Sequence, residues 1–175
     1  MKKEGYVAPV IVLTVICLVF GFLLSYVNSI TAPIIETAAA ETAELAKKEV
    51  LPDGDSFTEI TDVELPEAID QAFAAGNGAG HVYFATGSGY GGDMQIIVGI
   101  DSDGYITGTQ VLSHSETAGL GARVAAEDWN SQFPGEDSSL SDVTVISGST
   151  ISSNCFINLV KAAFEANDII TAEGE

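Results

Sequence analysis

Two short segments hold the side chains whose types and spacing could bind a ligand. The first, residues 113–123, reads SHSETAGLGAR and follows a predicted strand. Its His, Glu and Thr offer hydrogen-bonding groups, and Gly119 and Gly121 let the backbone approach a ligand closely. The second, residues 147–153, reads SGSTISS, ends a short β-prone run and opens the last predicted helix. A helix start presents free N–H groups and a partial positive charge, so this segment could hold a phosphate.

Each segment also has an ordinary structural interpretation, and other chemistries are poorly supported. A Ser/Thr run before a helix is usually a cap, and His114 with Glu116 could be a surface pair. The glycine-rich residues 87–92 precede a strand, whereas a dinucleotide-binding loop opens a helix. His81 and His114 are the only histidines and no CxxC occurs, which argues against zinc and iron–sulfur sites. A serine hydrolase would need a GxSxG elbow, which is missing.

Taken together, the two segments resemble the FMN-binding domain family, found in small subunits of the Rnf and sodium-translocating NADH:quinone oxidoreductase complexes. The family's first signature, roughly HxETPGLG, is matched by His114, Glu116, Thr117, Gly119, Leu120 and Gly121. Its second signature, SGATxxS, is matched by Ser147, Gly148, Thr150 and Ser153. Residues 89–92, residues 98–101, Trp129 and Gln132-Phe133 also look like the family, so the resemblance covers about residues 79–167. Ala118 stands where proline is usual, and Ser149 where alanine is usual.

In that family the threonine of the second signature carries FMN through a phosphoester that a separate flavin transferase installs. The resemblance therefore implies a covalent FMN on Thr150, with the flavin ring near residues 113–123, where His114, Glu116 and Thr117 could bond its polar edge. The cofactor would supply the redox chemistry and the protein would position it. The cofactor-binding residues implied are Thr150, Ser147, Gly148, Ser149, Ser153, His114, Glu116, Thr117, Gly119, Leu120 and Gly121.

The resemblance further implies an electron-transfer subunit of an Rnf-type ferredoxin:NAD complex, with other subunits of that membrane complex as partners and no turnover of its own. Three alternatives stay open. The chain could be the corresponding component of a sodium-translocating quinone reductase, an anchored extracytoplasmic binding module without a cofactor, or a stand-alone flavin reductase.

The N-terminal segment predicts a membrane-spanning helix. Residues 7–27 carry no charge, and about 20 apolar residues are enough to cross a bilayer as a helix. Lys2 and Lys3 precede this span and acidic residues follow it, so we expect a cytoplasmic N-terminus and an extracytoplasmic domain. A signal peptide cleaved after Ser29 is the alternative, although its apolar region would be unusually long. Lipoprotein processing at Cys17 is disfavoured because the bulky Ile16 precedes it.

The charge of the remaining chain excludes some partners. Residues 36–175 hold 24 acidic and four basic residues, and the whole chain has a net charge of −19. Such a surface repels nucleic acid and anionic lipid headgroups, so we expect neither as a partner of the domain. It suits either a merely solvated surface or docking to a basic protein. We expect no disulfide, because Cys17 lies in the apolar run and Cys155 in the domain.

The elements that must position the two segments form an α+β arrangement. We expect a transmembrane anchor (1–30), a stalk helix (31–52) closed by Pro52-Asp53-Gly54, an irregular connection (53–78), the FMN-binding domain (79–167) and an acidic tail (168–175). Within the domain we expect a small antiparallel sheet packed with helices. Its predicted strands lie near residues 81–85, 94–100, 105–112 and 143–146, with a hairpin turn at 101–104. An amphipathic helix is predicted to begin at Thr150. Its apolar face holds Ile151, Cys155, Phe156, Leu159, Val160, Ala163 and Phe164.

Overall fold

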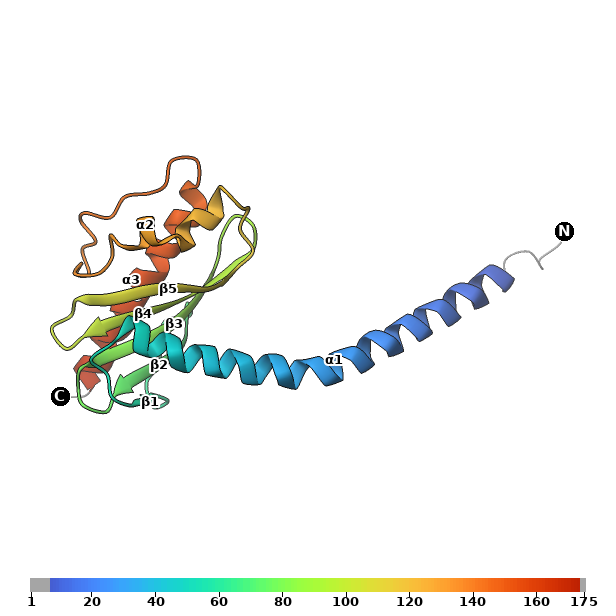
Figure 1. The fold of residues 1–175 in the computed structure, drawn as a ribbon, viewed down its shortest axis with the longest axis horizontal. Coiled ribbons are helices and arrows are strands. Elements are labelled where there is room, and N and C mark those ends of the chain that lie inside the picture. The colour runs from blue at the N-terminus through green and yellow to red at the C-terminus, as the bar shows by residue number, and fades with distance from the viewer. Residues whose placement is uncertain (1–6, 174–175) are drawn as a thin grey trace. The chain divides into compact units, whose positions relative to one another are not determined.

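The computed structural model describes residues 7–173, and the chain divides into two compact units, Met1–Ala43 and Glu44–Glu175. Helix α1 (Val7–Val50) begins in the first unit and ends in the second (Figure 1). Proline in a helix interior costs about 3 kcal/mol, yet the helix continues through Pro33, which lies in the expected stalk helix (31–52). The expected charge asymmetry depends on Lys2 and Lys3, which lie outside the described residues.

The first part of α1 is long and apolar enough to cross a bilayer. Residues Ala8–Ala32 have a mean hydropathy of 2.8, and none of this stretch is buried inside the protein. A single N-terminal helix of this kind fits either a single-pass anchor or a signal sequence.

Five antiparallel strands form one sheet in the order β1-β2-β3-β4-β5, so every strand pairs with its neighbours in sequence. The strands are β1 (Phe57–Glu59), β2 (Ile69–Ala75), β3 (Gly80–Ser88), β4 (Asp93–Asp101) and β5 (Ile106–His114). The predicted hairpin turn is confirmed: Oδ1 of Asp101 accepts hydrogen bonds from the backbone N–H groups of Asp103 and Tyr105, and Gly104 has a φ of 84°.

Two sequence expectations about strands were wrong. Residues 53–78 are not irregular throughout, because they contain β1 and β2. The β2 residues lack strict alternation since the pairing register with β3 shifts between Ile69 and Gln71, and this hides the strand in the sequence. Residues 143–146 form no strand. The side chain of Gln132 instead hydrogen-bonds the backbone N–H and carbonyl oxygen of Thr144, as a neighbouring strand would.

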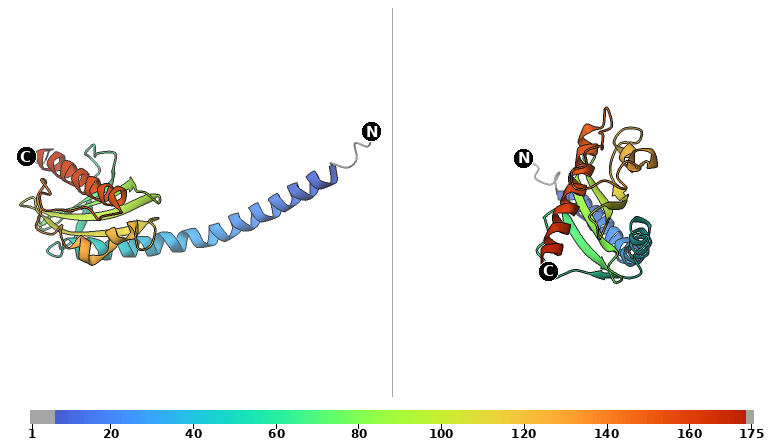
Figure 2. Two further views of the ribbon diagram at one scale, coloured as in Figure 1. Left: turned by 90° about the horizontal axis from the view of Figure 1, so that it is seen from above. Right: turned by 90° about the vertical axis from the view of Figure 1, so that its left-hand side faces the viewer.

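Helix α3 (Thr150–Glu173) covers one face of the sheet over β3 and β4 (Figure 2). Its predicted apolar face is confirmed for Cys155, Phe156, Leu159, Val160, Ala163 and Phe164, which are buried in the core. Ile151 is an exception, because its side chain is 56% exposed. The helix runs on to Glu173, so residues 168–173 of the expected acidic tail are helical.

The opposite face of the sheet is covered by the end of α1, within the second unit. Gly99 and Gly108 let the backbone of Val50 approach the sheet, because a Cβ at either position would lie within 3 Å of it. The Thr107 hydroxyl donates a hydrogen bond to the Val50 carbonyl oxygen. Both faces of the sheet are therefore closed, and the ends of β3, β4 and β5 near residues 88–93 and 114 stay available for a site.

Candidate functional site

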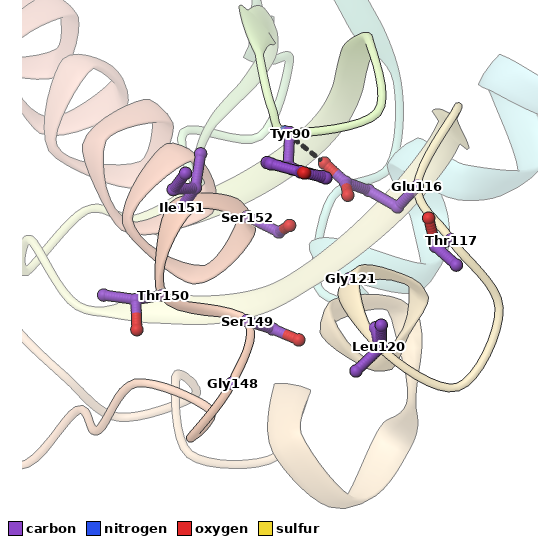
Figure 3. A pocket seen from close by; sticks show the side chains of 10 residues that line it. All are labelled: Tyr90, Glu116, Thr117, Leu120, Gly121, Gly148, Ser149, Thr150, Ile151 and Ser152. Carbon is purple, nitrogen blue, oxygen red and sulfur yellow. Dashed lines mark hydrogen bonds between the residues drawn. The ribbon is translucent and has the colours of Figure 1, made fainter.

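The two predicted segments meet in one cavity of about 450 Å³, a size typical of small-molecule sites (Figure 3). The 113–123 segment contributes Glu116, Thr117, Leu120 and Gly121, and the 147–153 segment contributes Gly148, Ser149 and Thr150 with Ile151 and Ser152. The turn between β3 and β4 adds Tyr90. His114, Gly119, Ser147 and Ser153 were also expected at the site but do not line this cavity.

The second segment places the cavity at the N-terminus of α3. Gly148 has a φ of 85°, which other residues rarely adopt, and Ser149 donates its backbone N–H to the Ile146 carbonyl oxygen at 3.0 Å. The N–H groups of the first helical turn have no partner within a helix, so they can receive an anion. Thr150 is exposed, and its side chain projects from the outer side of this turn, away from Glu116 (Figure 3).

Ser153 holds this turn together from within. Its fully buried hydroxyl donates to the Ser149 carbonyl oxygen at 3.0 Å and accepts the Ile146 backbone N–H at 3.1 Å. Trp129 adds a second restraint, because its indole N–H donates to the Thr144 carbonyl oxygen at 2.8 Å while its ring packs on Phe156 of α3. These contacts fix the segment that leads to Thr150.

Among the described residues that line the cavity, Glu116 alone is acidic, and it is only 8% exposed. Its Oε1 accepts the Tyr90 backbone N–H at 2.7 Å, whereas its Oε2 is buried without a hydrogen-bond partner. Among the described buried side-chain atoms, Oε2 alone lacks such a partner. Buried polar atoms are normally paired, so this oxygen points to a missing donor.

The residues on either side of Glu116 shape its loop, and they include the other predicted residues of the first segment. His114 accepts the Glu116 backbone N–H on Nδ1 at 3.2 Å, so it orients the loop from outside the cavity. Gly119 has a φ of 77°, and Leu120 donates its N–H to the Thr117 carbonyl oxygen at 3.1 Å. A four-residue turn with positive φ at its third residue often has proline at its second, and here Ala118 occupies that place.

Three large apolar side chains stand exposed at the cavity: Tyr90 (73%), Leu120 (55%) and Ile151 (56%). None of them was predicted to make an apolar contact with a ligand, and Tyr90, Ile151 and Ser152 were not predicted as site residues. Tyr90 lies in a glycine-rich turn far away in sequence, and Ile151 fits the helical spacing of the core. The exposed isoleucine directly after Thr150 matters because apolar side chains beside a cavity favour a ligand with an apolar surface.

Electrostatically the cavity is negative. Among the described residues that line it, none is Lys or Arg. Burial raises the pKa of the nearby Cys155 thiol, and the negative charges of Glu116 and then Asp93 raise it further. The charge of Glu116 therefore acts on groups around the start of α3.

Comparisons with known proteins agree with this geometry. The FMN-binding domain family matches residues 89–165, a range that includes every residue lining the cavity. The G subunit of the Na(+)-translocating ferredoxin:NAD(+) oxidoreductase complex of Acetobacterium woodii is 33% identical over 80% of this chain and 74% of its own length. The G subunit of the ion-translocating oxidoreductase complex of Methanosarcina acetivorans is 33% identical over 94% of this chain and 96% of its own length. The G subunit of the proton-translocating ferredoxin:NAD(+) oxidoreductase complex of Clostridium ljungdahlii is 25% identical over 87% of this chain and 86% of its own length.

Proposed function

Because this chain belongs to the family of G subunits of ion-translocating oxidoreductase complexes, we propose that it is a membrane-anchored electron carrier with FMN bound covalently to Thr150. The observation that carries the proposal is the meeting of both family signatures in one cavity at the N-terminus of α3. The residues present fit FMN: they offer a site for a phosphate, apolar side chains for a flat ring, and an unpaired acceptor for a ring donor.

The environment of Thr150 supports the phosphoester. Its exposed side chain is accessible to a flavin transferase, and the turn before it is held by Ser153 and Trp129. Forming the ester joins the Thr150 oxygen to the flavin phosphorus, with loss of the hydroxyl proton and of the leaving group on that phosphorus. The resulting phosphodiester keeps one negative charge beside the α3 N-terminus, which stabilises it. Ser149 in place of alanine adds a hydroxyl next to the acceptor but removes no group needed for the bond.

A covalent bond also suits the charge of the protein. With a net charge of −19 and no cation lining the described cavity, the domain would repel a free anionic cofactor. The ester makes retention independent of this repulsion. The flexible ribityl chain of FMN could then place the ring against Tyr90, Leu120 and Ile151, with Glu116 and Thr117 at its polar edge.

FMN supplies reversible one- or two-electron chemistry, and the chain contributes positioning and shielding. As in the relatives named for ferredoxin:NAD(+) oxidoreductase activity, we infer that other subunits of a membrane complex deliver and remove the electrons. The apolar helix at residues 8–32 would hold the carrier in the bilayer, with residues 44–173 outside the cytoplasm.

The proposal is tested by producing the full chain in a host with a flavin transferase. We expect the denatured protein to give a flavin-fluorescent band on a gel, and Thr150→Ala to abolish the band. Thr171→Ala is the matched control, since it also removes a threonine hydroxyl from α3, one that bonds only the Asn167 carbonyl oxygen. A fluorescent band retained by folded Thr150→Ala would overturn Thr150 as the attachment site. A wild-type chain without flavin in that host would overturn the proposal and favour the cofactor-free binding module.

A further inference from the structure

Two glycines leave the space that the Glu116 carboxylate occupies, and a hydrogen bond orients it there. A Cβ at Gly89 would lie 2.1 Å from its Oε1, and a Cβ at Gly121 would lie 2.1 Å from its Oε2. Only glycine at both positions leaves room for this carboxylate. The Tyr90 N–H then fixes Oε1, so that Oε2 is the oxygen left unpaired.

The surroundings of Glu116 Oε2 indicate what kind of group could donate a hydrogen bond to this oxygen. A carboxylate oxygen needs a donor, and a buried one without a donor costs free energy. No described residue supplies that donor. Glu116 lines the same cavity as the exposed side chains of Tyr90, Leu120 and Ile151, which favour an apolar ring. An oxidised flavin ring has a single N–H donor, the imide N3–H between its two carbonyl groups.

Building on the proposed function, we propose that Glu116 Oε2 accepts a hydrogen bond from the N3–H of the flavin and that its negative charge lowers the flavin's reduction potential. Glu116 is thus the residue that sets how strongly the bound flavin gives up electrons. Gly121 leaves room for Ser152 as well as for Glu116, since a Cβ at Gly121 would also lie 2.7 Å from the Ser152 Oγ.

The effect on the potential follows from charge balance. Taking up two electrons and one proton leaves the flavin ring with one additional negative charge. A fixed carboxylate in a partly dry cavity opposes that charge, and no Lys or Arg among the described lining residues offsets it. The pKa of the Cys155 thiol is raised mainly by burial, and the charge of Glu116 raises it further. Reduction is therefore harder with Glu116 than without it.

The test compares the flavinylated wild-type chain with Glu116→Gln, Glu116→Asp and Asp93→Asn in a redox titration against reference dyes. We expect Glu116→Gln to shift the reduction equilibrium about tenfold or more toward reduced flavin, which corresponds to about 30 mV for a two-electron couple. Asp93→Asn removes one nearby negative charge outside the cavity lining, so we expect a clearly smaller shift. Glu116→Asp keeps the charge and should stay close to the wild-type potential.

A second measurement examines the hydrogen bond itself and does not depend on the Gln variant folding. With ¹⁵N-labelled FMN, we expect the N3–H resonance to move upfield in both Glu116 variants, since the shorter Asp side chain withdraws its oxygen. An unchanged N3–H resonance in Glu116→Asp, or equal potentials in wild type and a folded Glu116→Gln, would overturn the inference. Both outcomes require flavin to be attached to wild type, so they are distinguishable from failure of the proposed function, in which wild type carries none.

Discussion

Gly121 determines how closely the loop that carries Glu116 can approach the first turn of α3. We expect Gly121→Ala to lower the free energy of unfolding by about 1–3 kcal/mol, because its Cβ would overlap Glu116 Oε2 and Ser152 Oγ. The same change should reduce flavin attachment or weaken ring contacts, measured as flavin fluorescence per protein. Gly119→Ala is the control: it meets no atom within 4 Å, but its φ of 77° costs about 1–2 kcal/mol. Equal flavin loss in both variants would contradict this role of Gly121.

His81 makes the stability of the domain depend on pH, and the direction of this dependence follows from the shift of its pKa. Burial lowers the pKa of His81 below its usual 6.5, and a hydrogen bond from Nδ1 to the Asn167 oxygen partly opposes this. At a pH between the folded-state pKa of His81 and its unfolded-state pKa, the unfolded chain binds more protons than the folded chain. The free energy of unfolding therefore falls as the pH drops through about 6.5, and it levels off below the folded-state pKa. Denaturant unfolding of wild type and His81→Gln should show this decrease in wild type only. A decrease of the same size in both would exclude His81 as its source.

At the scale of single residues, the sequence identified site residues where they belong to a contiguous motif. The segments around Glu116 and Thr150 could be identified from their residues, while Tyr90, Ile151 and Ser152 could not. Tyr90 reaches the cavity through the β3–β4 turn, and Ile151 fits the helical spacing of the core although it is exposed. Which oxygen of Glu116 stays unpaired depends on the Tyr90 N–H, which only the tertiary structure reveals.

Among the elements, the end of α1 seals one face of the sheet. We expect substitution of Leu51, the residue directly after α1, by alanine (Leu51→Ala) to cost about 2–5 kcal/mol in unfolding free energy, because Leu51 is 1% exposed and its loss leaves a cavity. Leu45→Ala, at a position that is 71% exposed, should stay within about 0.5 kcal/mol of wild type. Urea unfolding of both variants measures the difference. Similar costs would mean that this part of α1 does not belong to the folded domain.

The hairpin of β4 and β5 was predictable because Asp101-Ser102-Asp103-Gly104 specifies its turn locally. Strands β1 and β2 were missed since their residues lack a clean two-residue alternation. Pairing with β2 stabilises β1, and pairing with β3 stabilises β2. Residues 143–146 were wrongly expected to form a strand because their β-branched side chains suit one. Gln132 and Trp129 hold Thr144 instead, and such long-range contacts leave no local signal.

At the scale of the whole molecule, the fate of the helix at residues 8–32 decides between two alternatives. The protein is anchored in the membrane if the helix is retained, and it is secreted if the helix is cleaved off. If the anchor is retained, the chain stays in the membrane pellet after alkaline carbonate washing and keeps residues 1–29 in its intact mass. A variant lacking residues 1–32 should appear in the soluble fraction. Recovery of a wild-type chain that begins at residue 30 would instead establish the cleaved-signal alternative.

The flavin on Thr150 is the claim on which the electron-carrier account depends. The most direct measurement is mass spectrometry of the peptide spanning residues 147–161, from protein purified out of its native membrane. We predict that this peptide carries the mass of FMN less one water, with fragment ions placing it on Thr150 and not on the neighbouring serines. A peptide found only at its unmodified mass, in cells that flavinylate other proteins, would contradict the account.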